Sequence, residues 1–364
     1  MLPMIPRPPL RLCGMVGIFC LGQTLSAADP TADQQFWLEL INRMRTAPAD
    51  ELELFVNMSS PGVWDSPKSD HPTVAAALNF YGVDAAALLA QWGNLTPAAP
   101  LAWNNSLNAS ATLYSNTMVT EDQQAHGLGG QTVSQKIISA GYSSQWLEVG
   151  ESLFATAVDA THGHTALAID WGLDGGSGTG LQPGVGHREA LMFPLLKEIG
   201  IGYQSMAIPG SNAEVIGPLV VTQHYATRYR STIDGFVSDA ILTGVVYQDT
   251  LAADLFYTPG EGWTSTEIHV YDDATDLLLA SGFTNSAGGF NISLEGLTDG
   301  VLYRVEAPDT GLSGQTFTLT AHTEDYGEPV TFYDNVYTRF QVVPEPGSAF
   351  LMILSLWVFH RRLI

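Results

Sequence analysis

Cysteine is almost absent from this chain, which has two in 364 residues, Cys13 and Cys20, both close to the N-terminus. The rest of the sequence has no residue that could form a disulfide or act as a thiol nucleophile. Basic residues are also scarce, with 14 Lys and Arg against 37 Asp and Glu and a formal net charge of −23. This balance makes nucleic acids and anionic lipid surfaces poor partners. A chain of this length can bury a core without cross-links, and its length favours two domains.

Apolar runs are found at both ends of the sequence. Arg7 and Arg11 precede a short apolar run over 13–21, and the small residues Ser26, Ala27 and Ala28 follow it. This order of charge, apolar residues and small residues is typical of a secretory signal peptide. A membrane anchor is the alternative, but the run is short for a bilayer core of about 30 Å. We therefore expect residues 1–28 to be removed as the protein is exported.

The C-terminal segment combines three features. Pro344-Glu345-Pro346 precedes an apolar run over 349–359, and Arg361 and Arg362 follow it. The prolines keep the motif extended and open to an enzyme. The arginines would hold the end of the run on the cytoplasmic side of a membrane. An ordinary tail anchor is one explanation of this pattern.

The three features in this order resemble the PEP-CTERM sorting signal. The resemblance implies that residues 343–364 are a removable tail and that an exosortase-type sorting enzyme is a partner. It also implies delivery through the inner membrane to the cell surface or exopolysaccharide matrix of a Gram-negative bacterium. Contact with a membrane would then be limited to the removable terminal segments.

Between the two ends the pattern of the sequence changes once, near residue 230. Over 32–230 apolar residues recur with helical spacing, as at Trp37, Ile41 and Met44, and alternate with strand-like runs. This mixture predicts a layered α/β domain. Over 233–342 short β-rich runs are separated by Gly, Asp and Asn, which predicts a small all-β sandwich.

Three stretches of the first domain place a titratable residue beside glycine: Ala125-His126-Gly127, Gly150-Glu151-Ser152 and Gly186-His187-Arg188. Together with segments 42–45, 100–104 and 221–223, this ordered set resembles a bacterial member of the CAP superfamily, the cysteine-rich secretory, antigen 5 and pathogenesis-related group, also called SCP domains. The resemblance runs from about residue 32 to 228. It implies an α-β-α sandwich with a central cleft.

The same resemblance implies that two histidines and two acids line this cleft. His126, Glu151 and His187 match three of these positions, and the fourth, an acid after a helical tryptophan, falls best on Asp174, with Asp170 as the alternative. Two departures from the pattern are Ser152, where Asn commonly follows the Glu, and a Gly-rich stretch over 175–180 that lengthens the loop before His187.

Imidazoles and carboxylates in one cleft can act in two ways. They can bind a divalent ion, and His126, His187 and Glu151 would be ligands that suit zinc. They can also form His–carboxylate pairs that serve as general acid or base. Ser152 lacks the strained Gly-x-Ser-x-Gly turn of a serine hydrolase, which excludes that class. Whether the protein is an enzyme of another class stays open at this point. A second pair, His162 and His164, we interpret as helix surface rather than as metal ligands.

The second domain carries an acidic loop between its early strands. Segment 242–249, followed by Pro259-Gly260-Glu261 and later by segment 288–292, resembles the Cna-B and SdrD-like sandwich modules of bacterial surface proteins. The resemblance implies a calcium site formed by Asp249, Asp254 and Glu261. The alternative is a spacer and adhesion module in which these acids are simply solvated.

These observations predict a secreted, surface- or matrix-associated protein whose cleft binds a divalent metal and a lipid, peptide or glycan ligand. A metal-assisted hydrolase of peptide or polysaccharide is one alternative, and a structural matrix or adhesion protein without catalysis is another. Both the metal-binding and the acid–base hypotheses require the side chains of His126 and His187 to lie close together, with acids beside them, in one water-accessible cleft.

Overall fold

The computed structural model describes residues 29–60, 66–206 and 216–342. The predicted signal peptide and sorting tail lie outside these residues. Among the described helices, none alone is long and apolar enough to cross a bilayer, although two that meet at 106°, Pro72–Tyr81 and Ala85–Trp92, together have the necessary length and composition.

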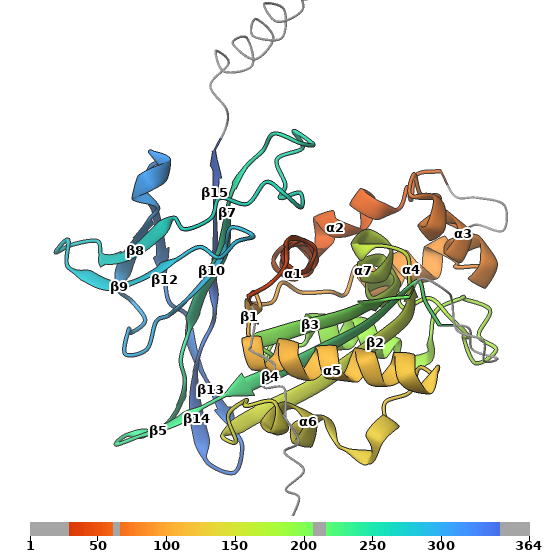
Figure 1. The fold of residues 1–364 in the computed structure, drawn as a ribbon, viewed down its shortest axis with the longest axis horizontal. Coiled ribbons are helices and arrows are strands. Elements are labelled where there is room, and N and C mark those ends of the chain that lie inside the picture. Colours follow the sequence, from red (N-terminus) through yellow and green to blue (C-terminus); the bar gives the residue numbers. More distant parts are fainter. Residues whose placement is uncertain (1–28, 61–65, 207–215, 343–364) are drawn as a thin grey trace, which may run out of the picture.

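The first part of the chain folds into three layers around a four-stranded sheet (Figure 1). The strand order is β1 (Ala102–Trp103), β3 (Glu198–Ser205), β4 (Leu219–Arg228) and β2 (Trp146–Ala157). β3 and β2 run antiparallel to β4, and β1 runs parallel to β3. One face is covered by α5 (Asn105–Glu121) and α6 (Val133–Ser139). The other is covered by α1 (Ala32–Thr46), α7 (Ala160–Ile169) and α8 (Gly186–Met192), with α2 (Pro48–Phe55), α3 (Pro72–Tyr81) and α4 (Ala85–Trp92) packed beyond them. This arrangement confirms the predicted α-β-α sandwich.

Local sequence explains how these layers form. Thr31 caps α1 through a capping box with Gln34, and the helix buries Trp37, Ile41 and Met44 in the core. On the opposite face α5 lies directly on β3, where the chain alternates Gly200-Ile201-Gly202. A Cβ on either glycine would come within about 2 Å of the α5 backbone, so only glycine allows this close approach.

The second part of the chain is built from strands only, apart from one short 3₁₀ turn, η4 (Pro308–Thr310). Its three sheets have the orders β10-β7-β15, β12-β11-β8-β9 and β13-β14-β6-β5, and a buried apolar core that includes Leu242, Val270 and Phe340 lies among them. This architecture is consistent with the predicted β-sandwich. The strands are β5 (Arg230–Thr232), β6 (Gly235–Ser238), β7 (Ile241–Gln248), β8 (Glu267–Asp272), β9 (Leu278–Phe283), β10 (Gly289–Ser293), β11 (Leu302–Glu306), β12 (Gln315–Thr318), β13 (Ala321–Asp325), β14 (Pro329–Tyr333) and β15 (Val336–Val342).

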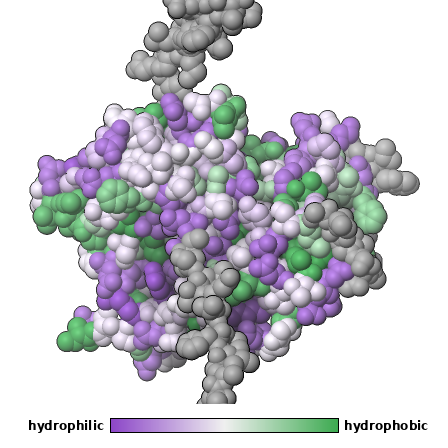
Figure 2. All heavy atoms as spheres, in the orientation of Figure 1, coloured by the Kyte–Doolittle hydropathy of each residue, from purple (hydrophilic) through white to green (hydrophobic). Residues whose placement is uncertain are grey.

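The surface carries no broad apolar face in the view of Figure 2, where hydrophobic residues form small separate patches among hydrophilic ones.

The two domains are joined by buried polar contacts. The Asn335 side-chain N–H donates to the carbonyl oxygens of Pro100 and Lys197 at 3.0 and 2.7 Å, and its Oδ1 accepts from the Ile241 N–H. Such contacts fix the sandwich against the α-β-α domain, because each is buried and geometrically specific.

A buried acid at the same interface gives a first prediction. Glu39 on α1 accepts hydrogen bonds from Gln35 and from Tyr337 on β15. Burial raises the pKa of Glu39 to about 7, against the opposing effect of these hydrogen bonds. Because its folded-state pKa is raised, its stabilising contribution is complete below pH 4.5 and is lost as pH rises through about 7. We expect Glu39→Gln to be more stable than the wild type by about 2–3 kcal/mol at pH 8, and equal to it near pH 4.

Chemical denaturation at both pH values measures this difference. Glu53→Gln is the matched control, because Glu53 lies on the exposed side of the neighbouring helix α2. Equal stability of Glu39→Gln and wild type at pH 8 would contradict the prediction.

Candidate functional site

The first cluster of titratable residues surrounds Glu151 in the middle of β2. Its Oε1 lies 2.8 Å from His126 Nδ1, and its Oε2 lies 2.7 Å from both Lys136 Nζ and His224 Nε2. Lys136 also sits over the ring of Tyr114, 3.1 Å from its centre. Burial alone would raise the pKa of Glu151, but hydrogen bonds from the two histidines and the lysine outweigh it and lower the pKa to about 2. Glu151 is therefore a buried carboxylate held in its charged form.

Two members of this cluster were not identified from the sequence. His224 faces Glu151 across the β2–β4 pairing and is fully buried, and burial lowers its pKa, so its neutral ring donates from Nε2. Lys136 comes from α6, next to the apolar residues Ile137 and Ile138. Their sequence context could have identified them. His224 lies in the middle of an apolar strand and Lys136 beside apolar helical residues, and a polar side chain buried in such a place needs a hydrogen-bonding or charged partner.

The second cluster is a histidine–aspartate pair at the end of α7. Asp170 ends this helix in the left-handed conformation, with a φ of 59°, and is fully buried. Its Oδ1 lies 2.7 Å from His187 Nδ1, and its Oδ2 accepts from the His187 backbone N–H at 2.9 Å. The carboxylate therefore fixes the ring, with the proton on Nδ1 and the lone pair of Nε2 available.

Asp170 thus takes the place that the sequence favoured for Asp174. Asp174 is exposed, and its two oxygens accept from the backbone N–H groups of Gly176 and Gly180, which lowers its pKa. Gly180 in turn packs on the turn between α3 and α4, where a Cβ would lie 2.5 Å from the Tyr81 carbonyl oxygen. Asp174 therefore shapes the glycine-rich loop and does not contact the histidine.

His187 lines a cleft of about 340 Å³ between α3, β2, α7 and the loop that follows α7. Its walls combine the aromatic rings of Phe154 and Trp171 with the side-chain amides of Gln124 and Gln182. His126 and Glu151 are not among its lining residues. Three of the four predicted residues therefore lie in two separate pairs, His126–Glu151 and His187 with Asp170, rather than in one cluster, and Asp174 belongs to neither pair. Segment 122–127 connects the two pairs, since Gln124 reaches the cleft.

Zinc does not fit this donor set as a single site. His187 belongs to a different pair from His126, and Glu151 already accepts from the Lys136 ammonium, which a dication would have to displace. Within the residues that the structure describes, no group of three or more His, Cys, Asp or Glu is placed to hold a metal ion. Zinc binding by His126, His187 and Glu151 stays a prediction.

The predicted calcium ligands of the second domain have other partners. Glu261 is buried and accepts three backbone N–H groups from segment 250–258. Asp249 accepts from the Leu255 N–H, and Asp254 accepts from the Phe256 N–H. The three acids therefore hold the loop through its backbone, and calcium binding stays a prediction.

Our interpretation of His162 and His164 as helix surface is wrong, because α7 is buried between α1 and β2. His162 accepts from the Val158 N–H, and His164 Nε2 lies 3.2 Å from Glu51 Oε1. Gly163 makes this packing possible, since a Cβ there would lie 2.4 Å from the Trp37 ring. Both histidines are structural parts of the core.

Some solved structures are similar to part of this chain. A search of solved structures finds an extracellular protein containing a SCP domain from Bacillus anthracis, at 16% identity and a TM-score of 0.26, covering 38% of this chain and 36% of that one. It also finds an outer surface protein of Borrelia burgdorferi, at 17% identity and a TM-score of 0.26, covering 45% and 98%. A venom allergen-like protein 4 of Schistosoma mansoni matches at 11% identity and a TM-score of 0.23, covering 36% and 70%.

The chain spans 36% of the length of the first of these structures. No curated protein matches the chain. The family model described as "CAP: Cysteine-rich secretory protein family" matches residues 38–225, which is more than half of the sequence. This region includes every element of the α-β-α sandwich from most of α1 to most of β4. The chain therefore belongs to the CAP, or cysteine-rich secretory protein, family.

Proposed function

We propose that this protein is a secreted binding protein that holds its ligand in the cleft beside His187. The observation that carries the proposal is the lining of that cleft, where aromatic rings stand next to a few polar groups of fixed position. Clefts of about 300–1,000 Å³ with such a lining are typical ligand sites. The proposal concerns binding alone and needs no metal.

The role of His187 follows from its contact with Asp170. Because Nδ1 donates to the carboxylate, Nε2 can accept a hydrogen bond from a ligand hydroxyl or amide group. Gln124 uses its Oε1 to accept from the Ala155 N–H, which fixes that side chain at the cleft wall. A ligand with an apolar part next to a hydrogen-bond donor fits this arrangement, and lipids, peptides and glycans share that chemistry.

Export and surface location are part of the same proposal. They are supported by the signal-peptide pattern over 1–28 and by the sorting-signal resemblance over 343–364. An exosortase-type enzyme would then be the processing partner, and the mature protein would act at the surface or in the exopolysaccharide matrix of a Gram-negative bacterium.

Binding measurements on the purified protein test the cleft. The probes are monopalmitoylglycerol, which carries an apolar chain next to free hydroxyls, a set of short peptides and a neutral hexasaccharide, measured by calorimetry. We expect one class to bind the wild type, and His187→Ala to weaken that binding by about tenfold or more. His322→Ala is the matched control, since His322 is a partly exposed histidine of the second domain.

The state of the His187 ring gives an independent readout. Nitrogen NMR of the wild type should show a proton on Nδ1 and none on Nε2 when the ring is neutral. Asp170→Asn should change this tautomer. In the wild type each carboxylate oxygen accepts one N–H of His187, but asparagine has an NH₂ donor in place of one of these oxygens. Unchanged affinity in His187→Ala, or an Nε2-protonated ring in the wild type, would contradict the proposal.

A hydrolase is the second candidate, favoured by the same histidine–aspartate pair. An imidazole oriented by a carboxylate can act as general base toward water. Turnover of the bound probe, lost in His187→Ala, would support this candidate over simple binding.

A further inference from the structure

Two adjoining hollows lie where the two domains meet, with volumes of about 360 and 590 Å³. Both are lined by Glu198, Arg228, Ile241 and Ser293, so they form one continuous depression, which we call the junction groove. The α-β-α domain contributes segment 103–106 at the start of α5. The sandwich contributes segments 283–285 and 289–291 of β9, β10 and the turn between them.

The walls of the junction groove are held in a fixed relation. Lys197, which lines it, donates to the carbonyl oxygens of Ser238, Asp239 and Tyr333 at 3.2, 2.5 and 2.6 Å. Asn335 bridges the domains beside it, as described above. The groove is therefore a preorganised feature, and a ligand would not have to order the two domains on binding.

Several side-chain amides in the junction groove have spare hydrogen-bonding capacity. Asn105 Oδ1 accepts from Trp103 Nε1, and Asn285 Oδ1 accepts from two backbone N–H groups. Both side chains are thereby held in position, while their NH₂ groups have no protein partner among the described residues. Asn291 on β10 is exposed at the same wall. These groups can donate to ligand hydroxyls.

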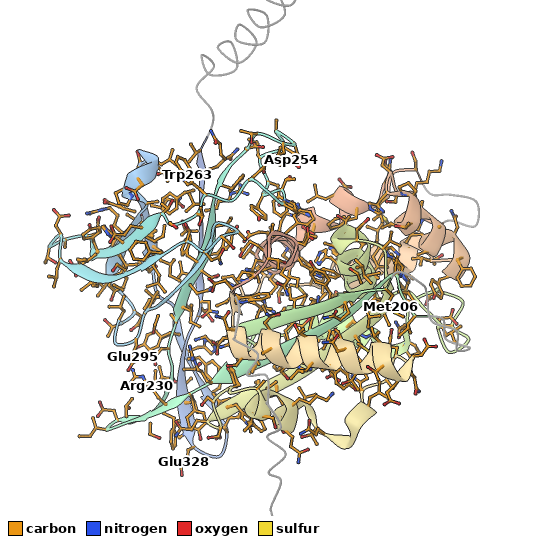
Figure 3. All side chains as sticks on the ribbon, in the orientation of Figure 1. Met206, Arg230, Asp254, Trp263, Glu295 and Glu328 are labelled. Atoms are coloured by element: carbon orange, nitrogen blue, oxygen red, sulfur yellow. The ribbon has the colours of Figure 1, made fainter. Side chains whose placement is uncertain are left out.

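The charges of the junction groove nearly cancel. Arg230 pairs with Asp239 at 2.5 Å and with Glu295 at 3.4 Å. Figure 3 labels Arg230 and Glu295 close to each other in the lower left of the view. Glu198 accepts from Asn104 and Tyr142, and Arg228 stands 3.4 Å away from it, with its side chain 52% exposed. Arg228 therefore keeps most of its donors for a ligand.

This charge balance selects the class of ligand. Three bases and four acids line the groove, and the whole chain has a net charge of −23, so an acidic polymer would be repelled. A neutral ligand rich in hydroxyl groups suits fixed carboxylate, guanidinium and amide groups, because a hydroxyl both donates and accepts.

An aromatic ring completes the site. Phe283, the last residue of β9, lines the groove and is 65% exposed. An exposed phenyl ring beside hydrogen-bonding side chains offers a flat apolar surface on which the C–H face of a sugar ring can pack. We propose that the junction groove binds a neutral oligosaccharide, with Phe283 packing on a sugar ring and Arg228, Asn105 and Asn291 donating to its hydroxyls.

Calorimetric titration of the intact secreted protein tests this proposal. The neutral probes are cellohexaose and isomaltohexaose, and the acidic probe is trigalacturonate. We expect a neutral probe to bind, and Phe283→Ala and Arg228→Ala each to weaken it by about tenfold or more. Both side chains are exposed, so these variants should keep the wild-type melting temperature.

Two controls separate this site from the cleft of the α-β-α domain. Phe80→Ala removes a phenylalanine that is 81% exposed on α3 and lines neither hollow, and it should leave binding unchanged. His187→Ala should also leave it unchanged, whereas it should weaken binding in the cleft by about tenfold or more. The proposal is overturned if neither neutral probe binds, if trigalacturonate binds in preference, or if affinity falls with His187→Ala and not with Phe283→Ala.

Discussion

Replacing Glu151 by alanine is expected to lower the free energy of unfolding by about 3–5 kcal/mol at pH 7, the usual cost of leaving a buried charge without its partner. The charge left behind is the Lys136 ammonium, whose side chain is 6% exposed. His224 would also lose the only acceptor that its Nε2 has among the described residues. Because β2, β4, α6 and the turn at His126 all meet at this carboxylate, its removal loosens four segments at once.

The pH dependence of the wild-type free energy of unfolding should also show the contribution of Glu151. The folded-state pKa of Glu151 is depressed to about 2 from its ordinary value of 4.5. Its contribution is therefore present above pH 4.5 and is lost as pH falls through about 2, and amounts to roughly 3 kcal/mol. Glu151→Ala should remove this acid dependence, so the two proteins should approach the same stability near pH 2.

Denaturant titrations at pH 7 and pH 2 measure both effects. Glu121→Ala is the matched control, because Glu121 is exposed at the end of α5. The double variant Glu151→Ala, Lys136→Met should recover much of the loss, since the unpaired cation is then gone. If Glu151→Ala were as stable as Glu121→Ala, Glu151 would be free to serve in ligand binding or catalysis. The expected result makes it a structural acid, and leaves His126, 62% exposed, as the accessible member of that cluster.

The layered fold could be predicted from the sequence because its signals are local. Helical spacing at Trp37, Ile41 and Met44 is a property of a few neighbouring residues, and the glycine-flanked motifs carried the family resemblance. The site could be predicted only in part. His126, Glu151 and His187 each have a histidine–acid contact, but which acid meets which histidine depends on the path of the chain between them.

The choice between Asp170 and Asp174 shows why. Asp170 directly precedes Trp171 and Asp174 follows it by three residues, so spacing along the chain alone allows either acid to reach His187. Asp170 makes the contact because α7 ends there in a left-handed turn that directs its carboxylate toward the start of α8. Asp174 is drawn away by the backbone N–H groups of the glycine-rich loop. Neither fact is visible in residue types or spacing.

The error on His162 and His164 has a related cause. Small neighbours such as Ala160 and Thr165 suggested a helix facing water. In a three-layer fold small residues are also found on a buried helix, because they let the adjacent helices and strands pack closely against it. The Trp37 ring packs directly on Gly163 in this way. His224 was missed because its partner, Glu151, lies on another strand, and strand register is set by the whole sheet rather than by local sequence.

Lys197→Met is expected to cost about 3 kcal/mol or more and to uncouple the two domains. Methionine has a similar length but no donor, so the carbonyl oxygens of Ser238, Asp239 and Tyr333 would lose their N–H partner in a buried interface. Each unsatisfied buried carbonyl costs about 1–3 kcal/mol. Removal of the buried cation offsets part of this loss, because burial lowers the pKa of Lys197 to about 7.

That pKa gives the variant a second signature. A base whose folded-state pKa is lowered binds fewer protons than the unfolded chain between pH 7 and 10.5, so wild-type stability should gain from this group as pH rises through that range. Lys197→Met lacks the group, and its deficit relative to wild type should grow with pH. Lys68→Met, at an exposed position, is the control and should show neither effect.

Differential scanning calorimetry separates a general loss of stability from uncoupling. The wild type should unfold in one transition, since the sandwich is fixed to the α-β-α domain by Lys197 and Asn335. Lys197→Met should show two, with the lower one belonging to the domain that depends more on the interface. A single unshifted transition would mean that the interface is stable without this lysine. The junction groove would then owe its fixed shape to Asn335 and to the contact between Glu39 and Tyr337, which the same experiment on Asn335→Ala would reveal.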